Sequence, residues 1–388
     1  MFSMYIHFPF CQKRCGYCDF FTRADMQSAI PAYVDSLVKE IEQVGTSAEE
    51  KLPVQTVFFG GGTPSLLSPA QASNILVSVG KYFTLLPGAE ISLEANPGTV
   101  NLEKLQGYQA AGINRISFGV QSFKDDELQF LERIHSSREA VDAFEMARAA
   151  GFTNINLDLI FGLPGQTVAS WADSLEQAVK LDPEHLSLYA LTIEEGTPLH
   201  RQVEAGKVIP LDDDISADMY QLAEEMLTSG GYNHYELSNW AAKRDGKVQS
   251  CIHNLQYWLN LPYLGIGAGA HGCAAGYRYS NAADIGGYIQ AMTRKPGMQF
   301  PFSNAIDSMQ AIDKRTEMNE TMMLGLRLLE QGVRDLEFAE RFGAGIGVVY
   351  PKQVNLLIQQ GLLEWKDGSL RLTRRGHLLG NRVFREFV

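Results

Sequence analysis

The stretch Cys11-Gln12-Lys13-Arg14-Cys15-Gly16-Tyr17-Cys18 places three cysteines at positions i, i+4 and i+7, just after a short apolar run. With five cysteines in the chain, chance gives this spacing only on the order of one time in a thousand. Three closely spaced thiolates can hold three irons of a [4Fe–4S] cluster and leave the fourth iron open. A structural zinc site usually needs a fourth protein ligand. We predict that Cys11, Cys15 and Cys18 bind such a cluster, with zinc or free thiols as the alternative.

Outward from the cysteines, short β-branched or aromatic runs alternate with helical patterns. The predicted strands cover residues 5–8, 56–59, 91–94, 115–120, 155–160 and 186–190. Helix-start signals stand between them, such as Ser68 before Pro69 and the capping box that begins at Ser136. Repeated strand–helix units build a parallel sheet with right-handed crossovers. We therefore predict an α/β fold with a partial (βα)6 TIM-like barrel, although periodicity alone leaves a doubly wound sheet open.

After about residue 200 the repeat ends and the pattern changes. The chain reads helical from about residue 314, and a helix, a short strand, a turn and a second short strand follow over 356–373. This order is similar to a small winged-helix module. We predict three units: a barrel core over 1–210, an extension over 211–300 and a mostly helical, winged-helix-like C-terminal domain over 301–388. We expect that last domain to be a packing or lid domain rather than a DNA reader.

Charge and composition limit the possible partners and compartment. The net charge is −12, so the overall field repels nucleic acid and anionic membrane surfaces, and we expect no nucleic-acid partner. The first residues show no basic segment followed by an apolar run, and no stretch approaches the roughly 18 apolar residues of a spanning helix. We expect a cytoplasmic protein, in which thiols stay reduced.

Polar residues recur at the ends of successive predicted strands. Gly60-Gly61-Gly62-Thr63 follows the second strand, Glu94 ends the third, Gln121 follows the fourth, and Asp158 lies within the fifth. A carboxylate in an apolar strand is unfavourable unless it is paired, and a structural hydrogen bond could explain any one of them. Their recurrence at one edge of a parallel barrel favours a polar ligand there.

These features together carry a resemblance. The Cys-x-x-x-Cys-x-x-Cys spacing resembles the radical S-adenosylmethionine (SAM) superfamily, and Tyr5-Ile6-His7-Phe8-Pro9-Phe10-Cys11 resembles its oxygen-independent coproporphyrinogen III oxidase branch. The resemblance implies that the open iron binds SAM, which one-electron reduction then cleaves to a radical, with a donor such as a flavodoxin or ferredoxin. It also implies a set of SAM contacts: Tyr5, Gly61, Gly62, Thr63, Glu94, Gln121, Arg133 and Asp158.

Two features separate this chain from the oxidase. Phe20 stands where the oxidase has a fourth cysteine, and the chain lacks the long extension that precedes the oxidase cysteines. In both respects it resembles the HemW family. His253-Asn254-Leu255-Gln256-Tyr257-Trp258 matches the H-N-x-x-Y-W motif of that family, which implies that His253 binds heme. If this segment is helical, His253 and Tyr257 share one face. Cys251 is expected to be a buried thiol, with a role in heme ligation as the alternative.

The resemblance to the HemW family implies a function. It implies a heme chaperone that binds heme on a radical SAM scaffold and transfers it to acceptor hemoproteins, respiratory enzymes among them. The alternative is a SAM-dependent oxidase or decarboxylase of a porphyrinogen-like substrate, although coproporphyrinogen III oxidase activity is not expected. The expected cofactors are a [4Fe–4S] cluster, SAM and heme. A purely electron-transferring iron–sulfur protein is disfavoured because the SAM contacts are complete.

Overall fold

Six parallel strands follow one another across the large sheet in the order in which they occur in the chain. The computed structural model describes all of residues 1–388. The strands are β1 (Phe2–Phe8), β2 (Pro53–Gly61), β3 (Thr84–Ala95), β4 (Arg115–Gln121), β5 (Ile155–Phe161) and β6 (His185–Ala190). A doubly wound sheet would reverse direction at a switch point, and this sheet does not. The predicted partial barrel is therefore confirmed.

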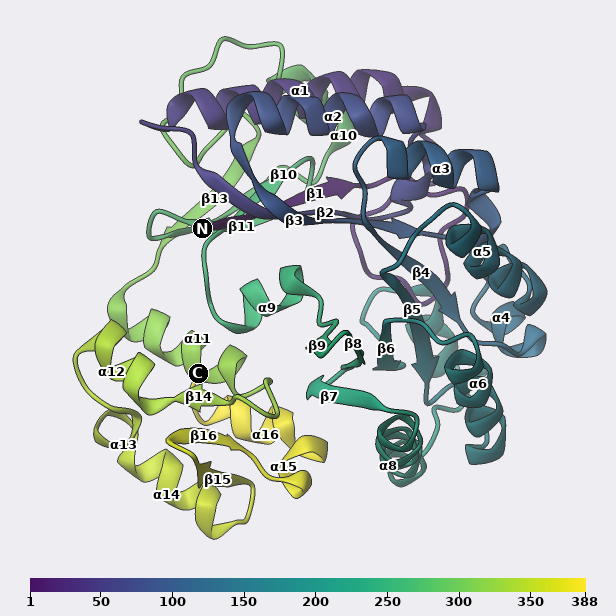
Figure 1. The fold of residues 1–388 in the computed structure, drawn as a ribbon, viewed down its shortest axis with the longest axis vertical. Coiled ribbons are helices and arrows are strands. Elements are labelled where there is room, and N and C mark those ends of the chain that lie inside the picture. The colour runs from purple at the N-terminus through teal and green to yellow at the C-terminus, as the bar shows by residue number, and fades with distance from the viewer.

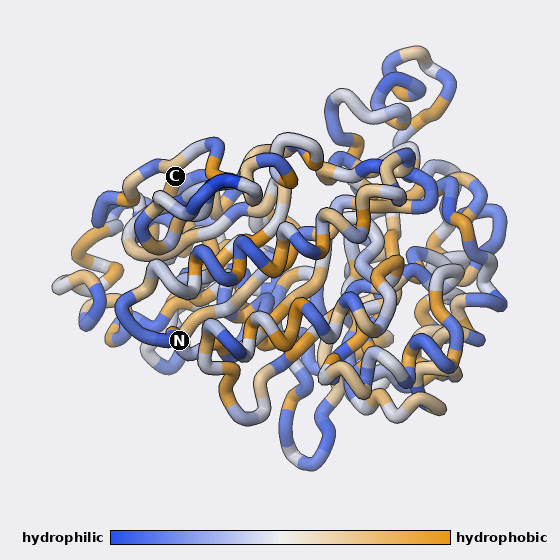
Figure 2. Tube along the Cα trace, turned by 90° about the horizontal axis from the view of Figure 1, so that it is seen from above, coloured by the Kyte–Doolittle hydropathy of each residue, from blue (hydrophilic) through white to orange (hydrophobic).

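The crossover helices lie on the outer face of this curved sheet (Figure 1). They are α1 (Ile30–Ser47), α2 (Pro69–Tyr82), α3 (Leu102–Ala110), α4 (Asp125–Phe130), α5 (Ser137–Ala149) and α6 (Val168–Lys180), with short 3₁₀ turns at Gln27–Ala29, Pro64–Leu66 and Pro97–Thr99. Ser136 forms the predicted capping box, and Ser68, predicted as a helix cap, also forms one, with Gln71. Figure 2 shows hydrophilic and hydrophobic segments alternating along the trace, as expected for helices with one buried face.

Alternation along each strand separates an apolar outside from a polar inside. Met4, Ile6 and Phe8 of β1 are fully buried and belong to the main hydrophobic core. Tyr5 lies between them in sequence and therefore points to the opposite side, into the barrel. There it lines a cavity with polar side chains of other strands, including Asp158. The interior of this barrel is therefore suited to a polar ligand.

Further strands extend both edges of the parallel sheet. Next to β1 come β10 (Tyr263–Ile266), β11 (His271–Ala274), β12 (Tyr277–Asn281) and β13 (Ile306–Ala311), and next to β6 come β8 (Asn239–Arg244), β7 (Tyr232–Glu236) and β9 (Lys247–Val248). All their pairings except that of β10 with β1, which is parallel, are antiparallel. The end strands β13 and β7 do not pair, so the barrel stays open. The helices of this part are α7 (Pro198–Glu204), α8 (Asp213–Ser229), α9 (Ile252–Trp258) and α10 (Ile285–Ala291).

The C-terminal domain has a hydrophobic core of its own, made of 17 buried residues between Met322 and Phe387. Its elements are α11 (Lys314–Gly325), β14 (Val333–Arg334), α12 (Asp335–Phe342), α13 (Ile346–Val349), α14 (Pro351–Gln359), β15 (Leu363–Lys366), β16 (Ser369–Leu372), α15 (Arg374–Leu378) and α16 (Gly380–Arg385). The order α14, β15, turn, β16 is the winged-helix-like order predicted from the sequence. The division at residue 300 differs from the structure, because β13 pairs with β12 in the large sheet.

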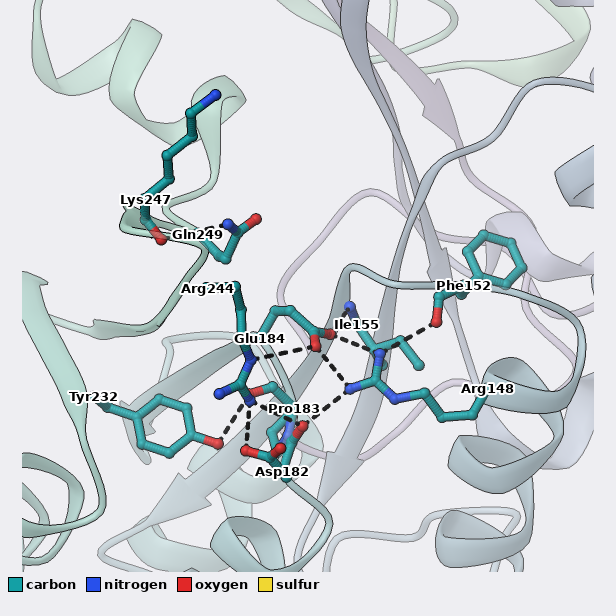
Figure 3. Close-up of polar contacts among 10 residues, drawn as sticks. All are labelled: Arg148, Phe152, Ile155, Asp182, Pro183, Glu184, Tyr232, Arg244, Lys247 and Gln249. Atoms are coloured by element: carbon teal, nitrogen blue, oxygen red, sulfur yellow. Dashed lines mark hydrogen bonds and ion pairs between the residues drawn. The ribbon is translucent and has the colours of Figure 1, made fainter.

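Ion pairs tie the start of β6 to its neighbours (Figure 3). Arg148 of α5 makes two hydrogen bonds to the Glu184 carboxylate, at 2.8 and 2.9 Å, and Glu184 also accepts from the Ile155 N–H at 3.0 Å. Arg244 of β8 pairs with Asp182 beside them. These contacts join α5, β5, β6 and β8.

No helix in the structure is both long and apolar enough to cross a membrane.

Candidate cofactor site

A cavity of about 370 Å³ opens at the carboxyl ends of the parallel strands, where sites of β/α barrels gather. Its lining includes the three cysteines and seven of the other predicted site residues: Cys11, Cys15, Cys18, Gly61, Gly62, Thr63, Glu94, Gln121, Arg133 and Asp158. Two predicted residues, Tyr5 and His253, do not line it. Residues from four strands, from the cysteine loop and from the segment between α4 and α5 therefore meet around one space.

The cysteine loop leaves β1 and is fixed at both ends by backbone hydrogen bonds. The Cys11 N–H donates to the Arg23 carbonyl at 2.9 Å, and the Cys18 N–H donates to the Cys15 carbonyl at 3.2 Å. All three thiols are free of disulfides. Burial raises the pKa of Cys11 and Cys18, so thiolates at this place need a metal to stabilise their charge.

The glycine segment after β2 packs directly against the start of the cysteine loop. The Gly62 N–H donates to the Phe8 carbonyl at 2.9 Å, and the Thr63 N–H donates to the Phe10 carbonyl at 2.8 Å. A Cβ at Gly62 would lie 2.7 Å from the Phe10 carbonyl oxygen, closer than real Cβ atoms come. Glycine is therefore required here for the contact between the two loops as well as for room in the cavity.

Two half-buried carboxylates, Glu94 and Asp158, face the cavity. Burial, with the nearby charge of Asp158, raises the pKa of Glu94 to about 8. Burial also raises the pKa of Asp158, although Asn156 at 2.7 Å and Ser117 at 3.1 Å donate hydrogen bonds to it. Two such acids in one cavity are unfavourable without a cation. The ammonium and sulfonium groups of SAM supply positive charge of this kind.

Arg133 and Gln121 complete the wall of the cavity. Nη1 of Arg133 lies 3.6 Å from Sγ of Cys15, and Nη2 donates to the Gly119 carbonyl at 2.7 Å. Arg133 therefore touches the candidate cluster site itself. Gln121 has a φ of 68°, the left-handed region that residues other than glycine rarely adopt. Backbone strain of this kind collects at functional sites.

Tyr5 and His253 lie in a neighbouring cavity of about 160 Å³, which shares Glu94 and Asp158 with the first. Nδ1 of His253 lies 2.7 Å from the Thr56 hydroxyl, and Nε2 lies 2.9 Å from the Tyr257 hydroxyl. The side chain is 1% exposed, and burial lowers its pKa to about 3, so the ring is neutral.

The predicted helix around His253 is present as α9, and the predicted shared face of His253 and Tyr257 is confirmed by their contact. Cys251, just before α9, is 1% exposed, and burial raises its pKa to about 12. Its sulfur contacts Glu90 at 3.6 Å. It is the buried thiol that the sequence analysis expected.

Sequence reasoning missed Arg115, which also lines the smaller cavity. Arg115 is 2% exposed, and its Nε has no hydrogen-bond partner. A signal was available, because Arg115, Ser117 and Gly119 alternate along β4 and so point to the same inner side. A buried guanidinium beside two carboxylates helps to balance their charge.

The cavity therefore fits the group that the cysteine spacing suggests. It offers three thiols on one fixed loop, a glycine cradle and two carboxylates, Glu94 and Asp158, that can face positively charged groups of a ligand. Residues 5–178 match the family model described as the Radical SAM superfamily, and residues 312–379 match the HemN C-terminal domain. Fold and site thus define a radical SAM protein, a class whose members use a [4Fe–4S] cluster and SAM.

Curated relatives narrow this class. The chain is 37% identical to "Heme chaperone HemW" of Bacillus subtilis, covering 100% of this chain and 99% of the relative. It is 36% identical to "Heme chaperone HemW" of Escherichia coli, covering 100% and 98%. The chain belongs to the HemW family.

A solved structure supports the fold. The coproporphyrinogen III oxidase HemN of Escherichia coli, a radical SAM enzyme, superposes with a TM-score of 0.83 over 100% of this chain and 89% of that one. Sequence identity is 24%, so this likeness concerns the fold.

Proposed function

We propose that this chain is a heme chaperone, which binds heme on a radical SAM scaffold and transfers it to heme-accepting proteins. The observation that carries the proposal is the similarity over the full chain to the curated heme chaperones of Bacillus subtilis and Escherichia coli. The H-N-x-x-Y-W segment on α9 supports it, because α9 lies beside the cofactor cavity through their shared wall of Glu94 and Asp158.

In this proposal the residues of the larger cavity hold the cluster and SAM. Cys11, Cys15 and Cys18 would ligate the cluster, and Gly61, Gly62 and Thr63 would flank the methionine end of SAM. Glu94, Gln121, Arg133 and Asp158 would hold the amino-acid and ribose portions. When bound and reduced, the cluster supplies an electron for SAM cleavage. Tyr5 would act from the smaller cavity, where its hydroxyl lies 3.0 Å from Nδ1 of His7.

His253 is the proposed heme ligand, and its surroundings suit that role in one respect. The Thr56 hydroxyl donates to Ser3 at 2.6 Å, so it accepts from Nδ1–H of His253. The lone pair is therefore on Nε2, the atom that a metal needs, where it accepts from Tyr257.

Heme cannot reach this atom without a rearrangement. The cavity of about 160 Å³ is smaller than the roughly 300–1,000 Å³ of ligand pockets. The helix α9 must therefore move when heme binds. The C-terminal domain contacts the end of α9. Arg327 packs over the Trp258 ring, 4.4 Å from its centroid, and Arg341 donates a hydrogen bond to the carbonyl of Asn260, just after α9, at 2.9 Å.

The proposed partners are heme, heme-accepting proteins such as membrane respiratory enzymes, and an electron donor such as a flavodoxin or ferredoxin. The alternative function is that of a coproporphyrinogen III oxidase. It is disfavoured because this chain has Phe20 at the place of the oxidase's fourth cysteine. Phe20 is 63% exposed at the wall of the cofactor cavity.

Heme titration of the reconstituted protein tests the proposal. We expect stoichiometric uptake, seen as a shifted heme absorption band, and weaker uptake by His253→Gln. The exposed His271→Gln is the matched control and should bind as the parent does. A second arm supplies SAM, a strong reductant and coproporphyrinogen III without oxygen. Repeated conversion to the decarboxylated product would overturn the proposal in favour of the oxidase, and uptake that is independent of His253 would remove the ligand assignment.

A further inference from the structure

A second large cavity, of about 620 Å³, lies between the barrel core and the C-terminal domain and shares no lining residue with the cofactor cavity. Its wall brings together Glu224 of α8, His234 of β7 and His377 of α15. Their side chains are 12%, 11% and 14% exposed. Neither cluster, SAM nor heme binding uses these residues.

The three side chains converge on one point. Oε1 of Glu224 lies 2.8 Å from Nδ1 of His377 and 3.3 Å from Nδ1 of His234. One ligand atom from each residue falls within 4.8 Å of the others. Two imidazole nitrogens and a carboxylate oxygen form the donor set of His₂–carboxylate metal sites.

The hydrogen bonds of His234 fix which of its ring nitrogens carries a hydrogen. Its Nε2 lies 3.3 Å from the Leu237 carbonyl and 3.4 Å from the Tyr220 hydroxyl. That hydroxyl donates its hydrogen to the same carbonyl at 2.9 Å, so neither oxygen has a hydrogen to offer. Nε2 must therefore carry a hydrogen. In the neutral ring Nδ1 turns its lone pair toward Oε1 of Glu224, and a metal ion or a proton must then lie between these two acceptors.

The surroundings hold the three ligand atoms in place for a metal ion. Trp240 stacks on the ring at 4.0 Å and holds its orientation. Arg374 contacts the other oxygen of Glu224, Oε2, at 3.4 Å and leaves Oε1 to the two histidines. Histidines that bind a metal through one ring nitrogen usually donate a hydrogen bond from the other nitrogen to a carbonyl or carboxylate. Nε2 of His234 makes such a contact with the Leu237 carbonyl.

We propose that Glu224, His234 and His377 bind one divalent first-row transition metal of the zinc type. The first two ligands belong to the core and the third to the C-terminal domain, so the ion ties the two together. The three protein ligands leave one position of a tetrahedral ion free, on the side of the cavity, for water or a small ligand. The proposal is independent of heme binding.

Zinc content tests the proposal in the full, cluster-loaded protein, in which iron occupies the cysteines. After incubation with Zn²⁺ and dialysis against metal-free buffer, we expect about one zinc per chain and a raised Tm. His377→Ala and the milder His377→Gln should bind zinc at least about tenfold more weakly and lose the Tm shift. X-ray absorption at the zinc edge should show nitrogen and oxygen neighbours without sulfur.

The matched control is His200→Ala. His200 also pairs with a carboxylate, Glu204 at 3.5 Å, but no third ligand joins them. This variant should keep the zinc and the Tm shift. Equal zinc content in the parent and in folded His377→Gln would overturn the proposal, as would sulfur neighbours of the zinc. A parent protein that retains no zinc would also overturn the proposal, because Glu224, His234 and His377 would then be joined by hydrogen bonds alone.

Discussion

The backbone N–H of Gly61 donates a 3.1 Å hydrogen bond to Oε2 of Glu94, and this contact joins the ends of β2 and β3 inside the cofactor cavity. Despite this bond, burial and the charge of Asp158 raise the pKa of Glu94 from 4.5 to about 8. Between these two values the folded chain binds more protons than the unfolded chain. Ionisation of Glu94 therefore lowers the stability of the cofactor-free protein as the pH rises through this range.

Glu94→Gln should remove this pH dependence. The variant should gain stability over the parent as the pH rises from about 5 to about 8, on the order of 1–3 kcal/mol at the upper end. Denaturant unfolding of cofactor-free protein at several pH values measures the gain. Glu103→Gln, a change at an exposed carboxylate of α3, is the control and should show no such trend. An equal gain at every pH would mean that Glu94 does not titrate in this range.

SAM binding should depend on the same carboxylates. Glu94→Ala or Asp158→Ala is expected to weaken SAM binding by roughly 1–3 kcal/mol, because each removes a charged hydrogen-bond acceptor that would contact the amino-acid or ribose portion of the ligand. Iron content should stay near that of the parent, since neither residue belongs to the cysteine loop. Isothermal titration of the reconstituted protein measures the affinity, with the exposed Asp142→Ala as control. Unchanged affinity in both variants would show that these acids do not contact SAM.

The cluster should depend on each cysteine of the loop. Cys11→Ala, Cys15→Ala and Cys18→Ala should each fail to assemble about four irons per chain on anaerobic reconstitution. Cys251→Ala and Cys273→Ala are the controls and should reconstitute normally, because neither sulfur lines the cofactor cavity. Iron and sulfide analysis decides, and a full cluster in all three loop variants would refute the assignment.

The ion pair in Figure 3 should contribute measurably to stability. Glu184→Ala leaves Arg148 and the Ile155 N–H without their acceptor at a site where the carboxylate is 8% exposed. The cost of removing one partner is about 3 kcal/mol for a buried pair and less here, because Arg148 is 30% exposed. Asp142→Ala breaks the exposed pair with Arg138 and should change stability by less than about 1 kcal/mol. Equal effects in thermal unfolding would contradict the expected role of burial.

The sequence predicts the parts of this molecule that depend on local pattern. The strands β1 to β6, the caps at Ser68 and Ser136 and the wall of the cofactor cavity all follow from periodicity and from residues at strand ends. A parallel barrel brings its strand ends together whatever the details, so residues far apart in the chain can be assigned to one site.

Non-local pairing could not be predicted in the same way. The pairing of β10 with β1 joins segments about 260 residues apart, and no local pattern encodes it. For the same reason the sequence does not predict that Glu224, His234 and His377 meet, because these three residues are not arranged in any known metal-binding motif along the chain. The burial of His253 depends on where α9 packs, which only the tertiary structure shows.

Heme binding should open α9. In the structure Nε2 of His253 accepts a hydrogen bond from Tyr257 and has no access to a ligand as large as heme. Tyr257→Phe removes this bond, worth about 1 kcal/mol, and should speed heme uptake about fivefold if opening limits the rate. Hydrogen exchange of residues 252–258 should rise on heme loading, while the amides of β4 stay protected. Unchanged exchange in α9 together with full heme uptake would mean that the iron is bound at another residue, because His253 cannot reach it with the helix in place.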